Sequence, residues 1–395
     1  MLFLDAGRAV EREKTAVFIG SDFCRRPAYG VNHPLSIPRV GTVLRLCEQL
    51  GWLDREHYRP CTAASIEQLQ TFHDRAYLEA LRQADETHRV TAEVRERFGI
   101  GTLENPLFPE LFTRAATQVG GSILAAELAL EGRVSFHPAG GTHHGLRDRA
   151  SGFCYFNDPV FAIRRLQKGG VDRVLYADLD AHHGDGVQLA FEYDPGVATI
   201  SIHESGRWPY SGAADDRGGG NARNLPVPAG FNDSELAYLM SEVVVPHARQ
   251  FSPGAVVVTC GTDALSGDPL SRMALSNGAL WAAVEQLACL TRTVVVLGGG
   301  GYNPWTLARC WTGLWGRLSG RGLPATLPAG AVDILNGLSC DLIDEDEVKP
   351  EWKSTLRDVP NSGPVRDEVR DLARVHRKST AQRSGRAQRR MHELA

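Results

Sequence analysis

Two carboxylates and two imidazoles lie within the six residues 178–183, directly after an apolar segment that begins at Val174. Burying such a cluster without partners would cost several kcal/mol, so we expect it to be paired or bound to a metal ion. In an extended chain, residues two apart point to the same side, so Asp180 and His182 can face one ion. Asp178 falls on the same side and can support the ligands. An ordinary charged loop after a strand is the alternative, and the other polar clusters of the chain make it the weaker one.

A pair of adjacent histidines, His143 and His144, lies in a glycine-rich segment after the short strand-like segment 134–137. Such a pair, taken alone, is as often plain surface as a functional site. Here the chain also supplies Asp178 and Asp185, and a carboxylate that holds a histidine ring fixes its tautomer and raises its basicity. The pair is therefore a candidate for acid–base chemistry.

Two more polar sites follow apolar segments farther along the chain. Asp263 comes after residues 255–260, where a third metal ligand is expected, although a turn carboxylate of this kind usually has a structural role when it occurs alone. Tyr302 follows the four glycines 298–301, which leave the backbone bare beside a site. Glycine-rich loops also cradle phosphates, but neither a Lys-Ser/Thr pair nor a dinucleotide-binding glycine pattern accompanies this one.

Together these residues supply the parts needed to hydrolyse an amide. Asp180, His182 and Asp263 would be three protein ligands, which leave one position open for water, as in catalytic zinc sites. The metal would lower the pKa of that water and polarise a carbonyl group. Tyr302 would donate a hydrogen bond to the developing oxyanion.

The composition is that of a globular protein, since 43% of the 395 residues are hydrophobic and 23% are charged. No apolar run approaches the roughly 18 residues of a membrane span, and residues 1–14 lack the apolar segment of a secretory signal. The eight cysteines are scattered, with no Cys-x-x-Cys pair, which indicates reduced thiols. We therefore expect a cytoplasmic protein without membrane contact.

The net charge of −4 is unevenly spread along the chain. Residues 366–395 carry nine Lys/Arg and four Asp/Glu, which leaves −9 on residues 1–365. An acidic body argues against a nucleic-acid groove. We interpret the basic end as a solvated helix with a frayed terminus rather than a partner-binding arm. The sequence leaves the oligomeric state open.

Strand-like and helix-like segments alternate along the chain, which predicts an α/β fold with a mostly parallel central sheet flanked by helices. The predicted strands cover residues 15–20, 134–137, 174–177, 197–203, 255–260 and 293–297. The predicted helices cover residues 40–50, 65–70, 75–83, 110–131, 159–168, 187–193, 233–249, 276–291 and 305–317. Each polar cluster follows a strand, at the sheet edge where such folds bind ligands. We expect one catalytic domain over 15–335, a loop over 207–222 and a peripheral extension over 336–395.

Five motifs of this chain resemble those of the zinc-dependent histone deacetylase family, most closely its class I enzymes and the bacterial acetoin-utilisation (AcuC-like) proteins. The motifs are residues 140–144, 152–158, 178–186, 261–263 and 298–303, and the resemblance covers about residues 15–320. It implies the arginase/deacetylase fold in a single domain. It also implies a lysine deacetylase with one Zn2+ per chain, bound by Asp180, His182 and Asp263.

The resemblance implies roles for the residues around the metal. His144 would be the general base and acid, assisted by Asp185. His143 would be its electrostatic partner, assisted by Asp178. Tyr302 would stabilise the tetrahedral intermediate together with the metal.

The resemblance further implies a narrow tunnel for the acyl-lysine stem, because the acylated stem has lost its charge and suits an aromatic slot. Phe153 would form one wall and Tyr210, or else Trp208, the other. The remaining implied positions are Gly152 and Gly300 along the tunnel, Glu104 at the rim, where it would hold the substrate backbone, and Arg39 in an internal exit pocket. A structural K+ would use Asp178, Asp180 and Ser201, and a second K+ would lie near Phe191.

The leading hypothesis is thus hydrolysis of acetyl-lysine in an acetylated protein or peptide. A small acetylated amine such as an acetylpolyamine is an alternative substrate for the same chemistry. An arginase-like ureohydrolase with two Mn2+ is disfavoured, because a binuclear site needs additional Asp/His ligands. A non-catalytic acyl-lysine-binding scaffold is the last alternative, and loss of Tyr302 or of a zinc ligand would have favoured it.

Overall fold

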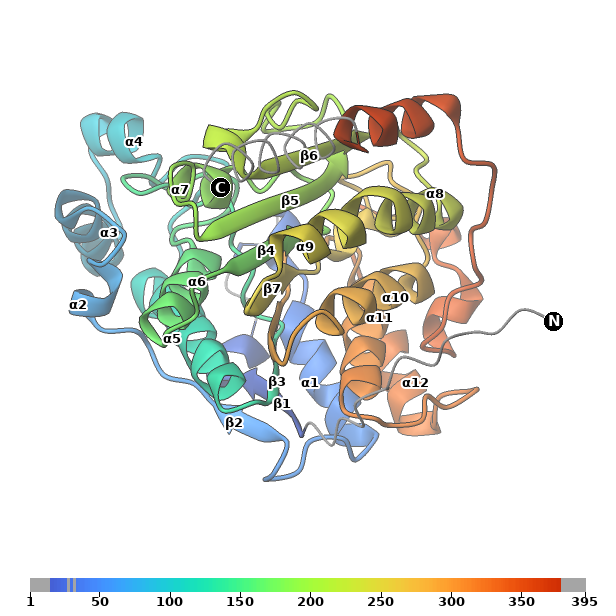
Figure 1. Ribbon diagram of the computed structural model, residues 1–395. Coiled ribbons are helices and arrows are strands. Elements are labelled where there is room, and N and C mark those ends of the chain that lie inside the picture. Colours follow the sequence, from blue (N-terminus) through green and yellow to red (C-terminus); the bar gives the residue numbers. More distant parts are fainter. Residues whose placement is uncertain (1–14, 27–28, 31–32, 378–395) are drawn as a thin grey trace, which may run out of the picture.

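The computed structural model describes residues 15–26, 29–30 and 33–377 (Figure 1). Within these residues eight strands form one sheet in the order β2-β1-β3-β8-β7-β4-β5-β6, and each pairing is parallel. The strands are β1 (Ala16–Gly20), β2 (Tyr58–Pro60), β3 (Val134–His137), β4 (Val174–Asp178), β5 (Val197–Glu204), β6 (Ala222–Val227), β7 (Ala255–Thr259) and β8 (Thr293–Leu297). The predicted α/β fold with a parallel central sheet is confirmed.

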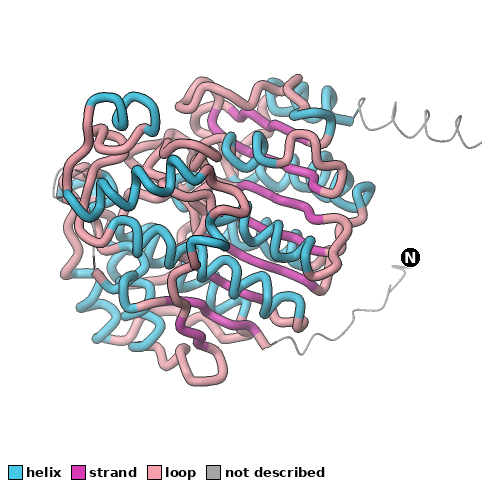
Figure 2. The backbone as a smooth tube through the Cα atoms, turned by 90° about the vertical axis from the view of Figure 1, so that its left-hand side faces the viewer, coloured by secondary structure: helices cyan, strands magenta, loops and turns pink. Residues whose placement is uncertain are grey.

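Helices cover both faces of the sheet (Figure 2). They are α1 (Arg39–Gln49), α2 (Ile66–Leu69), α3 (Arg75–Thr87), α4 (Ala92–Phe98), α5 (Leu111–Leu130), α6 (Asp158–Lys168), α7 (Asp185–Ala190), α8 (Asp233–Leu239), α9 (Val245–Phe251), α10 (Asn277–Ala288), α11 (Pro304–Leu318) and α12 (Ala329–Asn336). Strand β7 shows how the two layers form, since Val256 and Val258 join the core beneath α1 and α10–α12, whereas Val257 joins the core beneath α3, α5 and α6. Because both faces are buried, the central strands are continuously apolar.

The order of the strands brings the polar clusters together. Strands β3, β8, β7 and β4 are consecutive in the sheet although they are far apart in the chain. Parallel strands end at the same edge, so the loops that follow these four strands lie beside one another. These loops carry the histidine pair, Tyr302, Asp263 and Asp180 respectively.

The sequence patterns do not predict the two edge strands, β2 and β6. Each contains a proline, Pro60 or Pro226, which has no N–H for the ladder and is tolerated at an edge. The loop predicted over 207–222 accordingly ends one residue inside β6. Helices α4 and α12 were also not predicted. The helix predicted over 233–249 is divided by a π-helical turn, Met240–Val244, just before Pro246, which cannot donate to the preceding turn.

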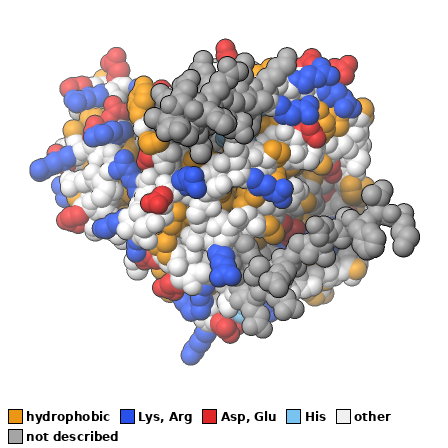
Figure 3. All heavy atoms as spheres, in the orientation of Figure 1, with side chains coloured by type: hydrophobic (Ala, Val, Ile, Leu, Met, Phe, Trp, Pro, Cys, Tyr) orange, Lys and Arg blue, Asp and Glu red, His pale blue; other side chains and the backbone are white. Residues whose placement is uncertain are grey.

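The extension beyond residue 335 is not peripheral in the structure, and this corrects the prediction. Leu338, Trp352, Leu356 and Val369 are buried in the same core cluster as the central strands. Between residues 337 and 366, single apolar residues rather than a periodic face anchor the segment, whereas the last described helix buries Val369, Leu372 and Ala373 at helical spacing. Figure 3 shows Lys and Arg side chains grouped over the last described helix, at residues 367–377. The rest of the basic end, 378–395, lies outside the described residues.

The arginines of this last segment are paired with acidic groups. Arg366 forms an ion pair with the fully buried Glu235 at 2.7 Å, and Arg377 pairs with Glu242 of the π-helical turn. The basic stretch is therefore held against α8 and its continuation. None of the described helices is long and apolar enough to cross a membrane.

Acid should destabilise the fold through His73. This ring is 2% exposed, accepts a hydrogen bond from Asn157 N at 3.2 Å and donates one to Arg147 O at 3.2 Å. Burial lowers its pKa from 6.5 to about 3, so the folded state favours the neutral ring. The unfolded chain therefore binds the extra proton, and the stabilisation is complete above pH 6.5 and lost as the pH falls toward 3.

The matching measurement is denaturant unfolding at pH 7.5 and pH 5.0. Over this range the His73 contribution to the free energy of unfolding should fall by about 2 kcal/mol. A His73→Gln variant should therefore lose less stability between the two pH values than the wild type does. An equal loss in both proteins would contradict the assignment.

Candidate metal centre and active site

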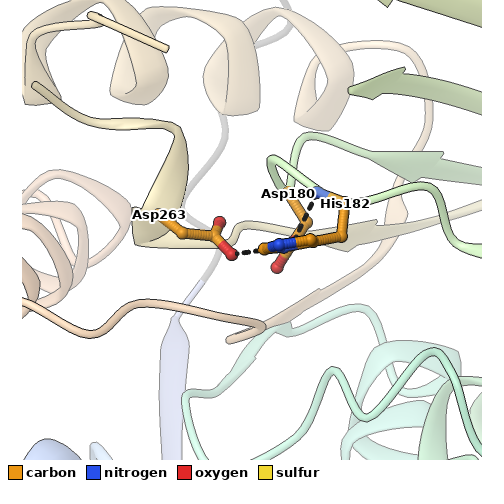
Figure 4. A group of neighbouring side chains, drawn as sticks. All are labelled: Asp180, His182 and Asp263. Carbon is orange, nitrogen blue, oxygen red and sulfur yellow. Dashed lines mark hydrogen bonds and ion pairs between the residues drawn. The ribbon is translucent and has the colours of Figure 1, made fainter. Parts of the chain in front are cut away.

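Three buried side chains converge at the carboxyl edge of the sheet (Figure 4). Asp180 and His182 lie in the loop after β4, and Asp263 lies in a short 3-10 turn, Thr262–Ala264, after β7. One ligand atom from each lies within 4.8 Å of the others. His182 Nδ1 is 3.2 Å from an Asp180 oxygen and 2.9 Å from an Asp263 oxygen. The structure thus brings together the three residues that the sequence predicts as ligands.

The charges of this triplet fit a divalent cation. Asp180 and Asp263 are fully buried, and among the described residues their ion-pair partners are histidines rather than Lys or Arg. Burial and the neighbouring charge of Asp180 raise the pKa of Asp263. Burial acts to lower the pKa of His182, but hydrogen bonds and charges from both carboxylates outweigh it and raise that pKa to about 10. The site therefore attracts positive charge, and its two oxygens and one nitrogen are ligands that Zn2+ accepts.

Glycines make room for these carboxylates. A Cβ atom added to Gly261 would lie 2.1 Å from Asp180 Oδ2, and one added to Gly300 would lie 2.1 Å from Asp263 Oδ2. The Gly300 N–H also donates to Asp180 Oδ2 at 2.6 Å. The glycine run after β8 therefore shapes the metal site directly, as well as leading to Tyr302.

A methyl group at Gly261 should displace a metal ligand. The substitution Gly261→Ala places its Cβ against both the carboxylate and the backbone of Asp180, so the carboxylate must shift. We expect zinc affinity to fall by roughly 10–100-fold, as when a group that orients a ligand is lost. Competition with a chromogenic chelator measures this affinity. Gly322→Ala, where no atom lies within 4 Å of the added Cβ, is the matched control. Equal zinc affinities in the two variants would contradict the role of Gly261 in making room for Asp180.

His143 lies beside the metal ligands and is held by Asp178. Its Nδ1 is 2.6 Å from Asp178 Oδ2, and its Nε2 is 3.8 Å from Asp180. Tyr176 donates a second hydrogen bond to the same Asp178 oxygen at 2.7 Å. Burial acts to lower the pKa of His143, but the charges of Asp178 and Asp180 outweigh it and raise the pKa to about 9. This ring is therefore cationic at neutral pH.

His144 has the opposite character. Its Nδ1 is 2.7 Å from Asp185, and the rings of the two histidines lie 3.9 Å apart between centroids. Burial, together with the charge of His143, lowers the pKa of His144 to about 4. His144 is therefore neutral at pH 7. Environments that separate two neighbouring pKa values in this way assign the proton acceptor and the cation.

Tyr302 faces the same space from the loop after β8. Its backbone N–H donates to Asp268 at 2.7 Å, and Asp268 also accepts the N–H of Asn303. The phenol is 6% exposed, and burial with the nearby charge of Asp263 raises its pKa well above 10. It therefore keeps its proton and can donate a hydrogen bond.

An internal cavity of about 160 Å³ runs beneath these groups. It reaches both histidines, two of the metal ligands, Tyr302, Phe153, Gly152 and Gly300. Arg39 lines its inner part, where the guanidinium donates to the carbonyl of Gly299 and lies 5.2 Å from the ring centre of Trp311. The role of Arg39 in an internal exit pocket stays a prediction.

The aromatic residues predicted at the mouth differ in their exposure. Phe153 lies 6.0 Å from the Tyr302 ring, as a wall residue would. Trp208 packs edge-on against His144 at 4.6 Å between centroids, whereas Tyr210 is 77% exposed, and neither residue lines the cavity itself. Gly152 lies between, where a Cβ would meet the Trp208 ring at 2.3 Å. The glycine-rich loop offers no periodic signal that separates the two aromatic residues, so only the fold distinguishes the buried contact of Trp208 from the exposed Tyr210.

The remaining predicted positions lie near the site, and their roles stay predictions. The Glu104 carbonyl is 3.4 Å from His33, whose ring packs on Phe153 at 4.6 Å, which places Glu104 near the mouth. Ser201 is the register neighbour of Asp178 in the sheet. Phe191 is buried at the end of α7.

Two contributors to the site escaped the sequence argument. Tyr176 was interpreted only as part of a buried strand, although it lies two residues before Asp178 and so faces the same side. Asp268 was seen in its motif without a role, because its contact with Tyr302 joins two loops that are far apart in the chain.

Comparisons with known proteins agree with this geometry. Residues 33–318 match the histone deacetylase domain family. The acetoin utilization protein AcuC of Bacillus subtilis is 33% identical over 326 residues, which cover 78% of this chain and 83% of the relative. Histone deacetylase 8 of Xenopus laevis is 35% identical, covering 67% of this chain and 83% of the relative.

Solved structures give the same result. The crystal structure of a histone deacetylase homologue from Aquifex aeolicus superimposes with a TM-score of 0.87 at 36% identity, covering 92% of this chain and 100% of that one. A structure of a histone deacetylase homologue complexed with SAHA gives a TM-score of 0.86 at 35% identity, with the same coverage. The chain belongs to the histone deacetylase family.

Proposed function

We propose that this protein is a Zn2+-dependent lysine deacetylase that hydrolyses the amide of acetyl-lysine in proteins or peptides. The observation that carries the proposal is the cluster itself. A buried Asp180–His182–Asp263 triplet, a neutral histidine, a cationic histidine and a protonated tyrosine surround one cavity. When bound, the metal supplies a water of lowered pKa and polarises the amide carbonyl.

The proton transfers are assigned to His144. Because its Nδ1 is engaged by Asp185, its Nε2 is the free position that accepts a proton from the attacking water. The same nitrogen then returns the proton to the departing lysine amine. His143 keeps its charge and stabilises the negative charge that develops nearby, and Tyr302 donates to the carbonyl oxygen as it becomes an oxyanion.

The walls of the mouth support a neutral alkyl stem as the group that enters. Phe153 lies next to Tyr302, and Trp208 packs against His144. An acetylated lysine presents four methylene groups and no charge, which this aromatic passage can bury. We also assign a structural K+ to the surroundings of Asp178 and Ser201, which adds positive charge behind the metal site.

A turnover assay on two substrate classes tests the proposal. The zinc-loaded protein is given an acetyl-lysine peptide and, separately, acetylspermidine or acetylputrescine. We expect kcat/KM to be at least roughly tenfold higher for the peptide, because the polyamine carries charges into an aromatic passage. Preference for the polyamine would overturn the assignment of substrate while keeping the chemistry, and silence on both would overturn the enzymatic assignment.

A further inference from the structure

The side chain of Asp158 holds the loop that leads into the histidine pair by hydrogen bonds. It is fully buried at the first turn of α6, and it accepts hydrogen bonds from Gly141 N at 3.0 Å and Thr142 N at 2.7 Å. The Thr142 hydroxyl also donates to it. Ser122 of α5 adds a fourth hydrogen bond, at 2.5 Å. Both carboxylate oxygens of Asp158 therefore accept hydrogen bonds from the two residues before His143 or from helix α5.

The preceding residue, Asn157, grips the other end of the same loop. Its side-chain amide donates to the carbonyl of His143 at 3.1 Å and to the carbonyl of Gly145 at 2.8 Å. Its side-chain oxygen meanwhile caps α6 by accepting the N–H of Val160. The carboxylate of Asp158 therefore holds the N–H groups before the histidine pair, and the amide of Asn157 holds carbonyls within and after it.

Close packing leaves this loop little freedom to move. A Cβ on Gly145 would lie 2.8 Å from the backbone of Phe156, and one on Gly186 would lie 2.6 Å from the His143 carbonyl. The ring of His143 makes a hydrogen bond of 2.6 Å to Asp178, and the ring of His144 makes one of 2.7 Å to Asp185. Bonds this short form only if the backbone of the loop is correctly placed, and a shift of about 1 Å can cost roughly 100-fold in rate.

We propose that Asn157 and Asp158 are positioning residues for catalysis, which act by fixing the backbone of His143 and His144 against α6. Neither side chain lines the cavity, so both act through the loop that carries the two histidines. The inference rests on the proposed deacetylase activity for its kinetic readout only. Its second readout, the ring N–H signals of the histidines, needs no substrate.

The substitution that separates positioning from simple helix capping is Asn157→Ser. Serine is itself a good N-cap, so α6 keeps its cap, but the shorter hydroxyl cannot reach both loop carbonyls. We expect kcat per zinc-loaded site to fall about tenfold while KM changes less than twofold, since the substrate walls are untouched. Asp158→Asn should have a larger effect, roughly 10–100-fold in kcat, because the amide turns an N–H toward donors.

The matched control is Asp233→Asn. Asp233 also accepts a backbone N–H and a serine hydroxyl, both from Ser276, but it lies away from the histidine loop. It should lower stability and leave kcat per loaded site unchanged. In 15N-histidine spectra, the Nδ1–H signals of His143 and His144 should shift in the Asn157 and Asp158 variants and stay in place in the control.

The outcomes separate cleanly. Wild-type kcat per site and unshifted ring signals in Asn157→Ser would overturn the inference. If Asp158→Asn does not fold, Asn157→Ser and Ser122→Ala, which removes one hydroxyl donor behind Asp158, decide the question. If the wild type proves inactive on every amide, the proposed function fails, and shifted ring signals still support the positioning role.

Discussion

Replacing Asp180 with alanine should strip the metal from the protein and reduce turnover to background. Asp180 is fully buried, and its two oxygens accept the N–H groups of His182 and Gly300 at 2.9 Å and 2.6 Å. Without this carboxylate, only two ligands remain and the charge that attracts the cation is halved. A water no longer acidified by a metal has a pKa near 15.7 rather than about 7, so no competent nucleophile forms at neutral pH.

Elemental analysis after dialysis measures the first effect, and thermal unfolding with added zinc measures it independently. The wild type should gain stability with zinc, because a ligand that binds only the folded state stabilises it, and the variant should not. Asp194→Ala is the control, since Asp194 closes a turn before β5, at the opposite end of the strands from the site. Stoichiometric zinc in Asp180→Ala would refute the ligand assignment.

Tyr302→Phe should lower kcat by roughly 10²–10³-fold while zinc remains bound. Burial raises the pKa of the phenol, so the hydroxyl keeps its proton and can donate a hydrogen bond. Removing the hydroxyl removes one donor to the oxyanion and leaves the ring, its contact with Phe153 and the backbone bond to Asp268 in place.

Because that donor acts mainly in the transition state, KM should change little. Single-turnover kinetics on the acetyl-lysine peptide separates the chemical step from product release. Tyr238→Phe, on α8 beneath Arg370, removes a hydroxyl far from the site and should leave kcat unaltered. A Tyr302→Phe enzyme within threefold of the wild type would remove the tyrosine from the mechanism.

Local signals explain what could be predicted from the sequence. Strands β3 and β8 begin and end at the predicted residues. The first alternates apolar and polar residues and the second is a short apolar run, and each is closed by a loop that contains glycine and proline. The pairing of His143 with Asp178, and of His144 with Asp185, was expected from the resemblance and is present in the structure.

Contacts between distant segments explain what was missed. Trp208 and Tyr210 share one loop, and only the fold decides that the indole packs on His144 while the phenol faces solvent. Between residues 337 and 366 the chain carries no amphipathic period. It is nevertheless fixed by single contacts such as the ion pair of Arg309 with Asp358 at 2.6 Å, which a pattern search cannot see.

The two ends of the parallel strands differ in their tolerance for sequence change. All four loops that carry chemistry leave the same edge, whereas the connections that enter the strands, such as Gly170 before β4 and Gly254 before β7, leave the other. A Cβ at Gly170 would meet no atom within 4 Å, but its φ of +91° favours glycine, so labels belong on neighbouring positions rather than on Gly170 itself. Fluorophores, affinity tags or surface-attachment points placed at this quiet edge would leave the reaction centre undisturbed, which makes it the natural side from which to immobilise or label the enzyme.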